Sequence, residues 1–189
     1  MRIKTLFAPL CLSAIAVVAV FLSQRNDEPI NSHHPDDLPG VEFVQPRETE
    51  DPLAWRVKPD SVYDGDTLKV FRAGEEKTIR FCGIDAPEMD QPLGERSRDV
   101  LHFFVNGEVV DLDLVDEDRY GRTVAEVIYR GQNMNVELVR SGLAWVWEQY
   151  ARRCPSYKQL MEAQRKAEAE GIGVHNGEHI KPWVWRNQN

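Results

Sequence analysis

The sequence predicts an α+β fold: a small barrel of five short strands, one helix after the third strand, and two further helices after the sheet. Three observations predict it. Apolar and polar residues alternate with a period of two in five short runs separated by turn residues. Three other stretches place apolar residues at helical spacing. An open sheet of five short strands would expose its edges, so we expect the sheet to close or half-close into a barrel.

The amino-terminal residues predict a targeting segment over residues 1–25. Arg2 and Lys4 precede an apolar run over residues 6–22 that carries no charge. This pattern is typical of a signal peptide or a short membrane anchor, and the sequence leaves its cleavage open. We therefore expect export, to the periplasm or the cell exterior, with anchoring to the inner membrane through residues 6–22 as the alternative to release.

An acidic linker is predicted next, over residues 26–53. Residues 26–52 contain eight acidic residues, five prolines, one arginine and no apolar period, which favours disorder. Of the formal charge of −8, about −4 is left for the remainder of the chain after residue 52. A mildly acidic domain argues against broad electrostatic binding of nucleic acid, so phosphate contacts would be local. A divalent cation would add positive charge that the residue count omits.

The first strands and the first helix follow from turn signals. Residues 55–83 alternate apolar and polar residues in three runs, broken at 64–65 and at 73–75, which predicts a three-stranded antiparallel meander. Residues 94–105 carry apolar residues at helical intervals and are followed by Asn106-Gly107, a helix stop. We expect the first helix there.

The rest of the domain predicts two strands and two helices. Residues 108–115 and 123–129 alternate apolar and polar residues, as strands do. Residues 135–145 place apolar side chains at helical spacing. Residues 155–170 are rich in Gln, Glu, Ala, Lys and Arg and are followed by Gly171, which predicts a last helix.

These elements predict one domain with an OB-like barrel. Five antiparallel strands with a helix after the third fit that architecture, and 189 residues with 42% hydrophobic content suffice for one core with spare length. We expect the domain over residues 54–175, a tail over residues 176–189 that packs on it, and a monomer.

Two acidic loops at strand ends carry the candidate chemistry. One reads Asp64-Gly65-Asp66-Thr67 and the other Asp85-Ala86-Pro87-Glu88. Each alone is an ordinary turn, but two rigid acidic loops can share one cation. Ca²⁺ takes carboxylate and carbonyl oxygens, which suits two aspartates and a loop carbonyl such as that of Ala86. The planar fork of Arg80 matches two phosphate oxygens, although a strand arginine also commonly pairs with acids.

The motifs resemble the thermonuclease family, that is, staphylococcal-nuclease-like (SNase) domains, from about residue 55 to about residue 174. The residues that carry the resemblance are Asp-Gly-Asp-Thr (64–67), Arg80, Gly-Ile-Asp-Ala-Pro-Glu (83–88), Gln-Pro-Leu-Gly (91–94), Asp-Arg-Tyr-Gly-Arg (118–122) and Asn-Val-Glu-Leu-Val-Arg-Ser-Gly-Leu-Ala (135–144). Their order and spacing make the resemblance specific.

The resemblance implies a calcium-dependent nuclease on an OB-fold barrel that cuts DNA or RNA and leaves 3′-phosphate ends. By motif position, Asp66 and Asp85 would bind Ca²⁺ together with the backbone carbonyl of Ala86. Asp64 would support the turn.

The same resemblance assigns roles to the charged residues around that cation. Glu88 would act as general base or orient the attacking water. Arg80 and Arg122 would neutralise the phosphate as its charge grows in the transition state. Tyr120 would reach a neighbouring phosphate, with burial in the barrel as the alternative, and Arg119 is expected to contact nucleic acid beside it.

Three features depart from the family pattern or extend it. The loop between Glu88 and the first helix is shorter than in the staphylococcal enzyme. Trp147 or Tyr150 could stack on a base, and core packing is an equal alternative. The terminal segment 181–186 resembles a Pro-Trp-x-Trp-Arg element of some bacterial members, and we expect it to pack on the barrel.

Cys82 and Cys154 are the two cysteines that lie beyond the leader's Cys11. An even pair in an exported domain predicts a disulfide, and two buried free thiols are the alternative.

Two other functions compete with a nuclease. One is a noncatalytic module that binds nucleic acid or protein on the same fold. The other is a calcium-binding structural domain of the cell envelope, which would leave Arg80 and Arg122 unexplained. The intact set of acidic and arginine positions favours catalysis, and the sequence leaves the choice between DNA and RNA open.

Overall fold

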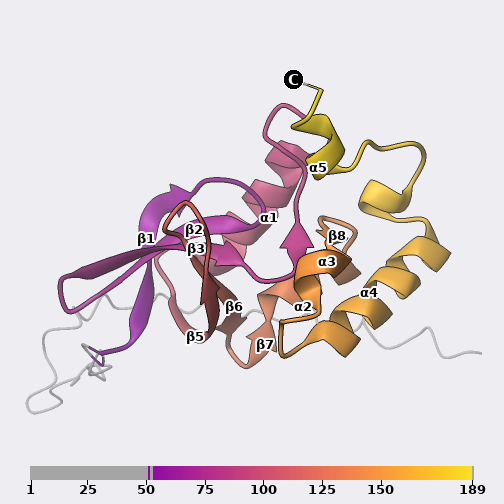
Figure 1. Cartoon of the computed structure of the whole chain (residues 1–189). Coiled ribbons are helices and arrows are strands. Elements are labelled where there is room, and N and C mark those ends of the chain that lie inside the picture. Colours follow the sequence, from indigo (N-terminus) through magenta and orange to yellow (C-terminus); the bar gives the residue numbers. More distant parts are fainter. Residues whose placement is uncertain (1–50, 52, 189) are drawn as a thin grey trace, which may run out of the picture. The chain divides into compact units, whose positions relative to one another are not determined.

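A mixed β-barrel forms the centre of the part of the chain that the computed structural model describes, residue 51 and residues 53–188 (Figure 1). Its strands are β1 (Trp55–Val62), β2 (Thr67–Arg72), β3 (Glu75–Phe81), β5 (Val109–Glu117) and β6 (Thr123–Tyr129). They follow the order β3-β2-β1-β5-β6, and a parallel pairing of β3 with β6 closes the ring. The predicted five-stranded α+β barrel is confirmed.

The turn between β2 and β3 shows how the sequence sets the strand register. Arg72 pairs with Glu75 across a two-residue loop of Ala73 and Gly74. Both loop residues have positive φ, 44° and 85°, as a type I′ turn requires. This turn matches the right-handed twist of the strands, so the meander predicted from residues 55–83 forms as expected.

Helices pack against the barrel. They are α1 (Gly94–Val105), α2 (Met134–Arg140), α3 (Glu148–Ala151), α4 (Tyr157–Glu170), the 3₁₀ turn η2 (Gly173–His175) and α5 (Pro182–Trp185). α1 contacts β1, α2 contacts β6, and α4 packs against α2, so the longer helices cover one side of the barrel (Figure 1). α1, α2 and α4 correspond to the three predicted helices, whereas the short helices α3 and α5 had no sequence signal.

The helix predicted over residues 135–145 was too long. α2 ends at Arg140 because Gly142 adopts a left-handed conformation with φ of 64°. The Leu143 N–H bonds the Leu138 carbonyl and the Gly142 N–H bonds the Val139 carbonyl, which is a Schellman cap. The apolar residues beyond this cap therefore lie outside the helix.

The chain after that cap forms a strand instead. β8 (Trp145–Val146) pairs antiparallel with β4 (Ile84–Asp85), which directly follows the β3 turn. A second short strand, β7 (Gln132–Asn133), forms a hairpin with β6. The β4–β8 pairing matters for function because it fixes the backbone of Asp85.

The core lies between the barrel strands and the helices. Val57, Leu68, Ile79 and Val127 are fully buried side chains of four barrel strands, and Leu101 of α1 is fully buried with them. Each buried side chain of this size stabilises the fold by roughly 1.5–3 kcal/mol. The apolar positions of the period-two pattern thus form one continuous core.

The predicted leader over residues 1–25 lies outside the described residues, and so does nearly all of the linker predicted over residues 26–53. In the described part, no helix is both long and apolar enough to cross a membrane.

Candidate active site

The loop between β1 and β2 turns the carboxylate of Asp66 into the protein. Asp64 Oδ1 accepts a hydrogen bond from the Asp66 backbone N–H at 2.9 Å, which forms an Asx turn. The turn packs so closely on Ser97 that only glycine fits at position 65, because a Cβ on Gly65 would lie 1.9 Å from Ser97 Oγ. Asp66 is only 4% exposed. Its Oδ2 accepts the backbone N–H of Ala86 at 2.6 Å, so the two acidic loops are joined directly.

Asp85 lies beside Asp66 and is linked to it by Arg80. The Asp85 backbone pairs with Trp145 in the β4–β8 sheet, and Asp85 is only 1% exposed. Arg80 Nη2 lies 2.6 Å from Asp85 Oδ1, and Arg80 Nη1 lies 3.0 Å from Asp66 Oδ1. The same Nη1 donates to the Ile84 carbonyl at 2.9 Å. One guanidinium thus bridges two buried carboxylates from different loops.

These carboxylates lie in a poorly solvated place that disfavours their charge. Burial, together with the neighbouring Asp66 carboxylate, raises the pKa of Asp64 to about 7. Burial also raises the pKa of Asp85 to about 6; Arg80 and Arg186 lower it, and Asp66 raises it. Because burial disfavours the ionised carboxylates, a bound cation would stabilise their charged form.

The raised pKa values predict that the cation-free protein loses stability as the pH rises from about 4 to about 7. In the unfolded chain both carboxyls ionise near 3.8, whereas in the fold Asp64 ionises at about 7 and Asp85 at about 6. In this window the native state binds more protons than the unfolded state. The free energy of unfolding therefore falls with rising pH, by up to about 1 kcal/mol per pH unit for each group.

Urea denaturation in chelator across this pH range measures the effect. Asp64→Asn should flatten the decline, whereas Asp111→Asn, at an exposed position of β5, should keep the parent slope. Equal slopes for the parent and Asp64→Asn would contradict the expectation.

Glu88 lies in the loop between β4 and α1, and two contacts hold that loop. The Glu88 backbone N–H donates to Gln91 Oε1 at 2.8 Å. Its carbonyl closely approaches Gly94 at the start of α1, where a Cβ would lie 1.9 Å from that oxygen. The Glu88 side chain stays partly exposed, at 32%. The loop therefore presents this carboxylate from a fixed backbone.

Arg186 also reaches this cluster, and sequence reasoning missed it. Its Nη2 lies 2.7 Å from Asp85 Oδ2 and its Nη1 lies 2.5 Å from Glu88 Oε1. Partial burial lowers the pKa of Arg186, but the hydrogen bonds that it donates to both carboxylates outweigh this and raise it. The sequence assigned segment 181–186 to packing alone, and its one signal was an arginine at the end of an aromatic run.

The turn between β5 and β6 supplies the remaining arginines. Asp118 Oδ2 accepts the Arg122 Nε at 2.7 Å, and Asp118 Oδ1 accepts the backbone N–H groups of Tyr120 and Arg122. Tyr120 is 68% exposed, so the alternative of a tyrosine buried in the barrel is wrong. Arg119 Nη2 donates to the Tyr120 hydroxyl at 2.6 Å. Both side chains therefore lie at the surface of the turn.

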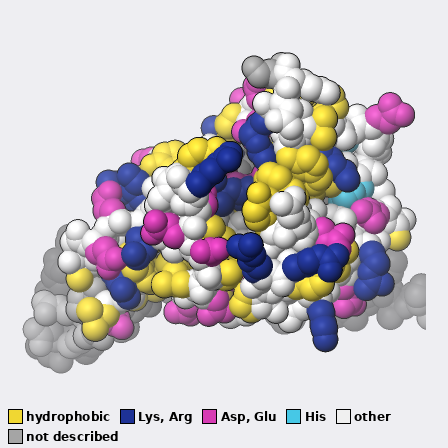
Figure 2. Space-filling view, viewed as in Figure 1, with side chains coloured by type: hydrophobic (Ala, Val, Ile, Leu, Met, Phe, Trp, Pro, Cys, Tyr) yellow, Lys and Arg dark blue, Asp and Glu magenta, His cyan; other side chains and the backbone are white. Residues whose placement is uncertain are grey.

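A single cavity of about 700 Å³ joins these groups. Its walls include all eight residues to which the sequence assigned chemistry or nucleic-acid contacts: Asp66, Arg80, Asp85, Ala86, Glu88, Arg119, Tyr120 and Arg122. Arg186 lines it as well. Figure 2 shows Lys and Arg side chains where this face is hollowed between the barrel and the C-terminal elements. Carboxylates and guanidinium groups in one cavity suit a phosphate ester with a cation.

The two aromatic candidates for base stacking differ in their surroundings. Trp147 stacks on Trp183, with ring centroids 5.3 Å apart and planes 15° apart. It meets Tyr150 edge to face at 4.6 Å. Tyr150 is 47% exposed and lines the cavity. Trp147 therefore packs against the C-terminal segment, and Tyr150 is the more accessible of the two rings.

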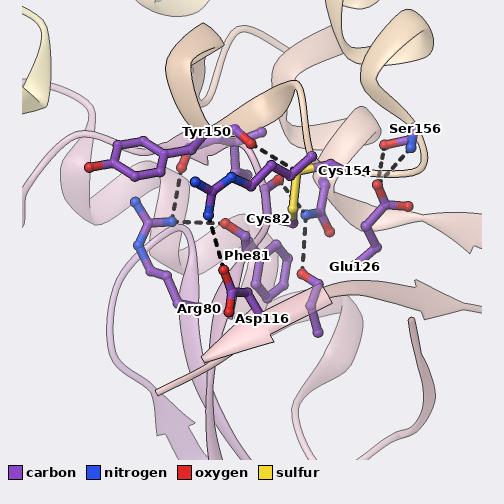
Figure 3. Close-up of a disulfide and its surroundings, with 12 residues drawn as sticks. Arg80, Phe81, Cys82, Asp116, Glu126, Tyr150, Cys154 and Ser156 are labelled. Carbon is purple, nitrogen blue, oxygen red and sulfur yellow. Dashed lines mark hydrogen bonds and ion pairs between the residues drawn. A yellow bond between two sulfur atoms is a disulfide. The ribbon is translucent and has the colours of Figure 1, made fainter. Parts of the chain in front are cut away.

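A disulfide borders the site, and its Cys82 lines the cavity. Cys82 and Cys154 are joined with a Cα–Cα distance of 5.9 Å. Figure 3 shows Cys82 directly after Arg80 and Phe81 at the end of β3, and Cys154 beside Tyr150. The bridge thus fastens the strand end that carries Arg80 to the segment that follows α3.

The metal-ligand inventory of the described residues is small. Among them, no group of three or more His, Cys, Asp or Glu side chains is arranged to hold a metal ion. Asp66 and Asp85 supply hard carboxylate oxygens, which suit Ca²⁺ in combination with backbone or solvent oxygens. The donor set fits that ion in kind.

Comparison with known proteins finds a nuclease family and relatives that are named as nucleases. The model of the family described as staphylococcal nuclease homologue matches residues 78–176. A Haemophilus influenzae protein named as an uncharacterized endonuclease is 40% identical over 129 residues, 67% of this chain and 70% of that protein. The micrococcal nuclease of Shigella flexneri is 32% identical over 136 residues, 66% of this chain and 76% of that protein.

Proposed function

Since the chain belongs to the staphylococcal nuclease family, we propose that it is a calcium-dependent endonuclease that hydrolyses phosphodiester bonds of DNA or RNA and leaves 3′-phosphate ends. Family membership supports the nuclease activity and a nucleic-acid substrate. The dependence on calcium and the position of the cut are the parts that the experiment below tests.

One observation carries the proposal. Arg80 bridges the buried carboxylates of Asp66 and Asp85, and the same cavity holds Glu88 and Arg122. A purely structural ion-pair cluster would not need a partly exposed glutamate and a second arginine in the same cavity. Phosphodiester hydrolysis needs a positioned base, donors for the phosphate oxygens and a Lewis acid.

The carboxylate pair is the proposed place of the cation. Asp66 and Asp85 would hold Ca²⁺ with the backbone carbonyl of Ala86, and the raised pKa of Asp85 supports this because a cation would stabilise a carboxylate that burial keeps from solvent. When bound, Ca²⁺ supplies Lewis-acid polarisation of a phosphate oxygen.

The chain's own side chains would do the rest. Arg80 and Arg122 donate hydrogen bonds to the phosphate oxygens, where charge grows in the transition state. Glu88 accepts a proton from the attacking water. Tyr120 and Arg119, exposed at the β5–β6 turn, bind the neighbouring phosphate of the strand. Tyr150 offers a ring for base stacking at the same cavity.

Chelation is the direct test of this function. The purified protein is incubated with end-labelled single-stranded DNA, double-stranded DNA and RNA, with calcium or with chelator. We expect cleavage with calcium and at least about a hundredfold less with chelator, because the Lewis acid is removed. The products should resist extension by a polymerase until a phosphatase removes their 3′-phosphates.

Matched variants separate site effects from general ones. Asp66→Asn should lose the calcium response, whereas Asp111→Asn on the outside of β5 should keep it. Equal cleavage in chelator would contradict the calcium requirement, and 3′-hydroxyl ends would contradict the proposed cut. Calcium binding without any cleavage would favour the structural alternative, and nucleic-acid binding without cleavage would favour the noncatalytic module.

We also propose that the protein is exported, either released or held at the inner membrane through residues 6–22. The disulfide between Cys82 and Cys154 supports export, because such bridges persist in oxidising compartments. Fractionation of cells that express the full chain tests it.

A further inference from the structure

Arg186 lies at the C-terminal end of the chain, yet its guanidinium contacts the centre of the carboxylate cluster. Nη2 lies 2.7 Å from Asp85 Oδ2, and Nη1 lies 2.5 Å from Glu88 Oε1 and 3.3 Å from Asp85 Oδ1. No other described arginine is hydrogen-bonded to both carboxylates. The tail thus contributes a charge to the site and does more than pack on the barrel.

The segment that carries Arg186 is seated by specific contacts. Trp183 stacks on Trp147 of the segment before α3. Gln91 Nε2 donates to the Ile180 carbonyl at 2.9 Å, from the same loop side chain whose oxygen holds the Glu88 backbone. A stacked indole pair and a buried amide are features of a built position for the arginine.

Both oxygens of Asp85 are taken by arginines. Oδ1 accepts Arg80 Nη2 at 2.6 Å and Oδ2 accepts Arg186 Nη2 at 2.7 Å. Any cation that uses Asp85 as a ligand must therefore compete with one of these guanidinium groups. The competition has a preferred outcome, because the two arginines are held very differently.

Arg80 is the arginine that stays. Its side chain is 13% exposed and also bonds Asp66 and the Ile84 carbonyl, so its departure would leave buried polar groups without partners. Arg186 is 39% exposed directly after α5, so its guanidinium can be hydrated when a cation takes its place on Asp85. Asp85 Oδ2 is thus the oxygen most easily vacated.

We infer that Arg186 is the internal counter-ion of the carboxylate cluster, which a divalent cation must displace from Asp85, so that this C-terminal residue sets the cation concentration at which the site is loaded. The inference rests on the proposed function, in which Asp66 and Asp85 hold the cation. It adds a residue and a structural segment that the family's motifs within residues 64–144 do not contain.

Calcium binding without nucleic acid tests this inference. Isothermal titration of the full chain with Ca²⁺ compares the parent, Arg186→Gln and Arg140→Gln, which removes the same charge from an exposed position on α2. We expect Arg186→Gln to bind Ca²⁺ about tenfold more tightly, the scale of one unit charge a few ångströms away. Arg140→Gln should match the parent.

Two further variants separate displacement from net charge. Arg186→Lys keeps the charge but loses the planar fork, so its affinity should fall between those of the parent and Arg186→Gln. Trp183→Ala keeps every charge but removes the stack that seats the segment, and it should also bind Ca²⁺ more tightly than the parent.

The outcomes are distinguishable from failure of the proposed function. A parent that neither binds Ca²⁺ nor cleaves overturns the proposed function itself. A parent that does both, with Arg186→Gln binding Ca²⁺ equally or more weakly, overturns only the counter-ion. Unchanged affinity in Trp183→Ala overturns it as well.

Discussion

Replacing Glu88 by Gln is expected to lower the rate of phosphodiester cleavage by about two to four orders of magnitude, the range of a positioned general base. The amide keeps the size of the side chain and its hydrogen bond from Arg186 but accepts no proton from water. The backbone contacts to Gln91 and Gly94 are untouched, so the loop should keep its position. Single-turnover cleavage at saturating calcium measures the effect.

Glu162→Gln, on the exposed face of α4, is the matched control and should cleave like the parent. Thermal unfolding of both variants shows whether the fold is retained. Near-parental cleavage by Glu88→Gln would remove this residue from its proposed role while leaving the cation site intact.

Removing the disulfide is expected to lower the free energy of unfolding by about 2–5 kcal/mol. The bridge joins Cys82 to Cys154 across 72 residues, so its loss frees a long loop in the unfolded chain. The bridge is also closely packed in the folded protein, because a Cβ on the neighbouring Gly83 would lie 2.8 Å from Cys154 Sγ. Guanidinium denaturation of the oxidised parent and of the Cys82→Ala/Cys154→Ala variant measures the difference.

The reduced parent is the control, and its stability should approach that of the double variant. A difference below about 1 kcal/mol would contradict a stabilising bridge. Labelling of Cys82 and Cys154 by a thiol reagent in the unfolded, unreduced protein would sink the pairing itself.

Local signals made the barrel and the motif-bearing loops predictable. The turn of Ala73 and Gly74 has chemistry that fits one hairpin type, and the alternation on either side fixes which face is buried. The loops that carry Asp66 and Asp85 lie at strand ends in the sequence pattern, and strand pairing brings such ends together. Structure that depends on residues close together in the sequence could thus be inferred from the sequence.

The parts that escaped prediction depend on contacts between distant segments. Periodicity continued α2 through Trp145, but the left-handed Gly142 ends it, and residues 145–146 pair with a strand from much earlier in the chain. Beyond its place at the end of an aromatic run, Arg186 had no local signal, because its partners at Asp85 and Glu88 lie a whole domain away in sequence. Spacing rules carry no information about such contacts.

The parallel pairing of β3 with β6 fixes the order in which the cavity can be assembled during folding. The meander that contains Asp66 and Arg80 forms from neighbouring strands, whereas Arg122 reaches the cavity only when Ile79 pairs with Thr123 and the ring closes. Closing that long loop costs more entropy than forming a hairpin, so it comes later. We therefore expect a refolding chain to bring Asp66 and Arg80 together before Arg122 joins them, so that cleavage returns only when the ring closes.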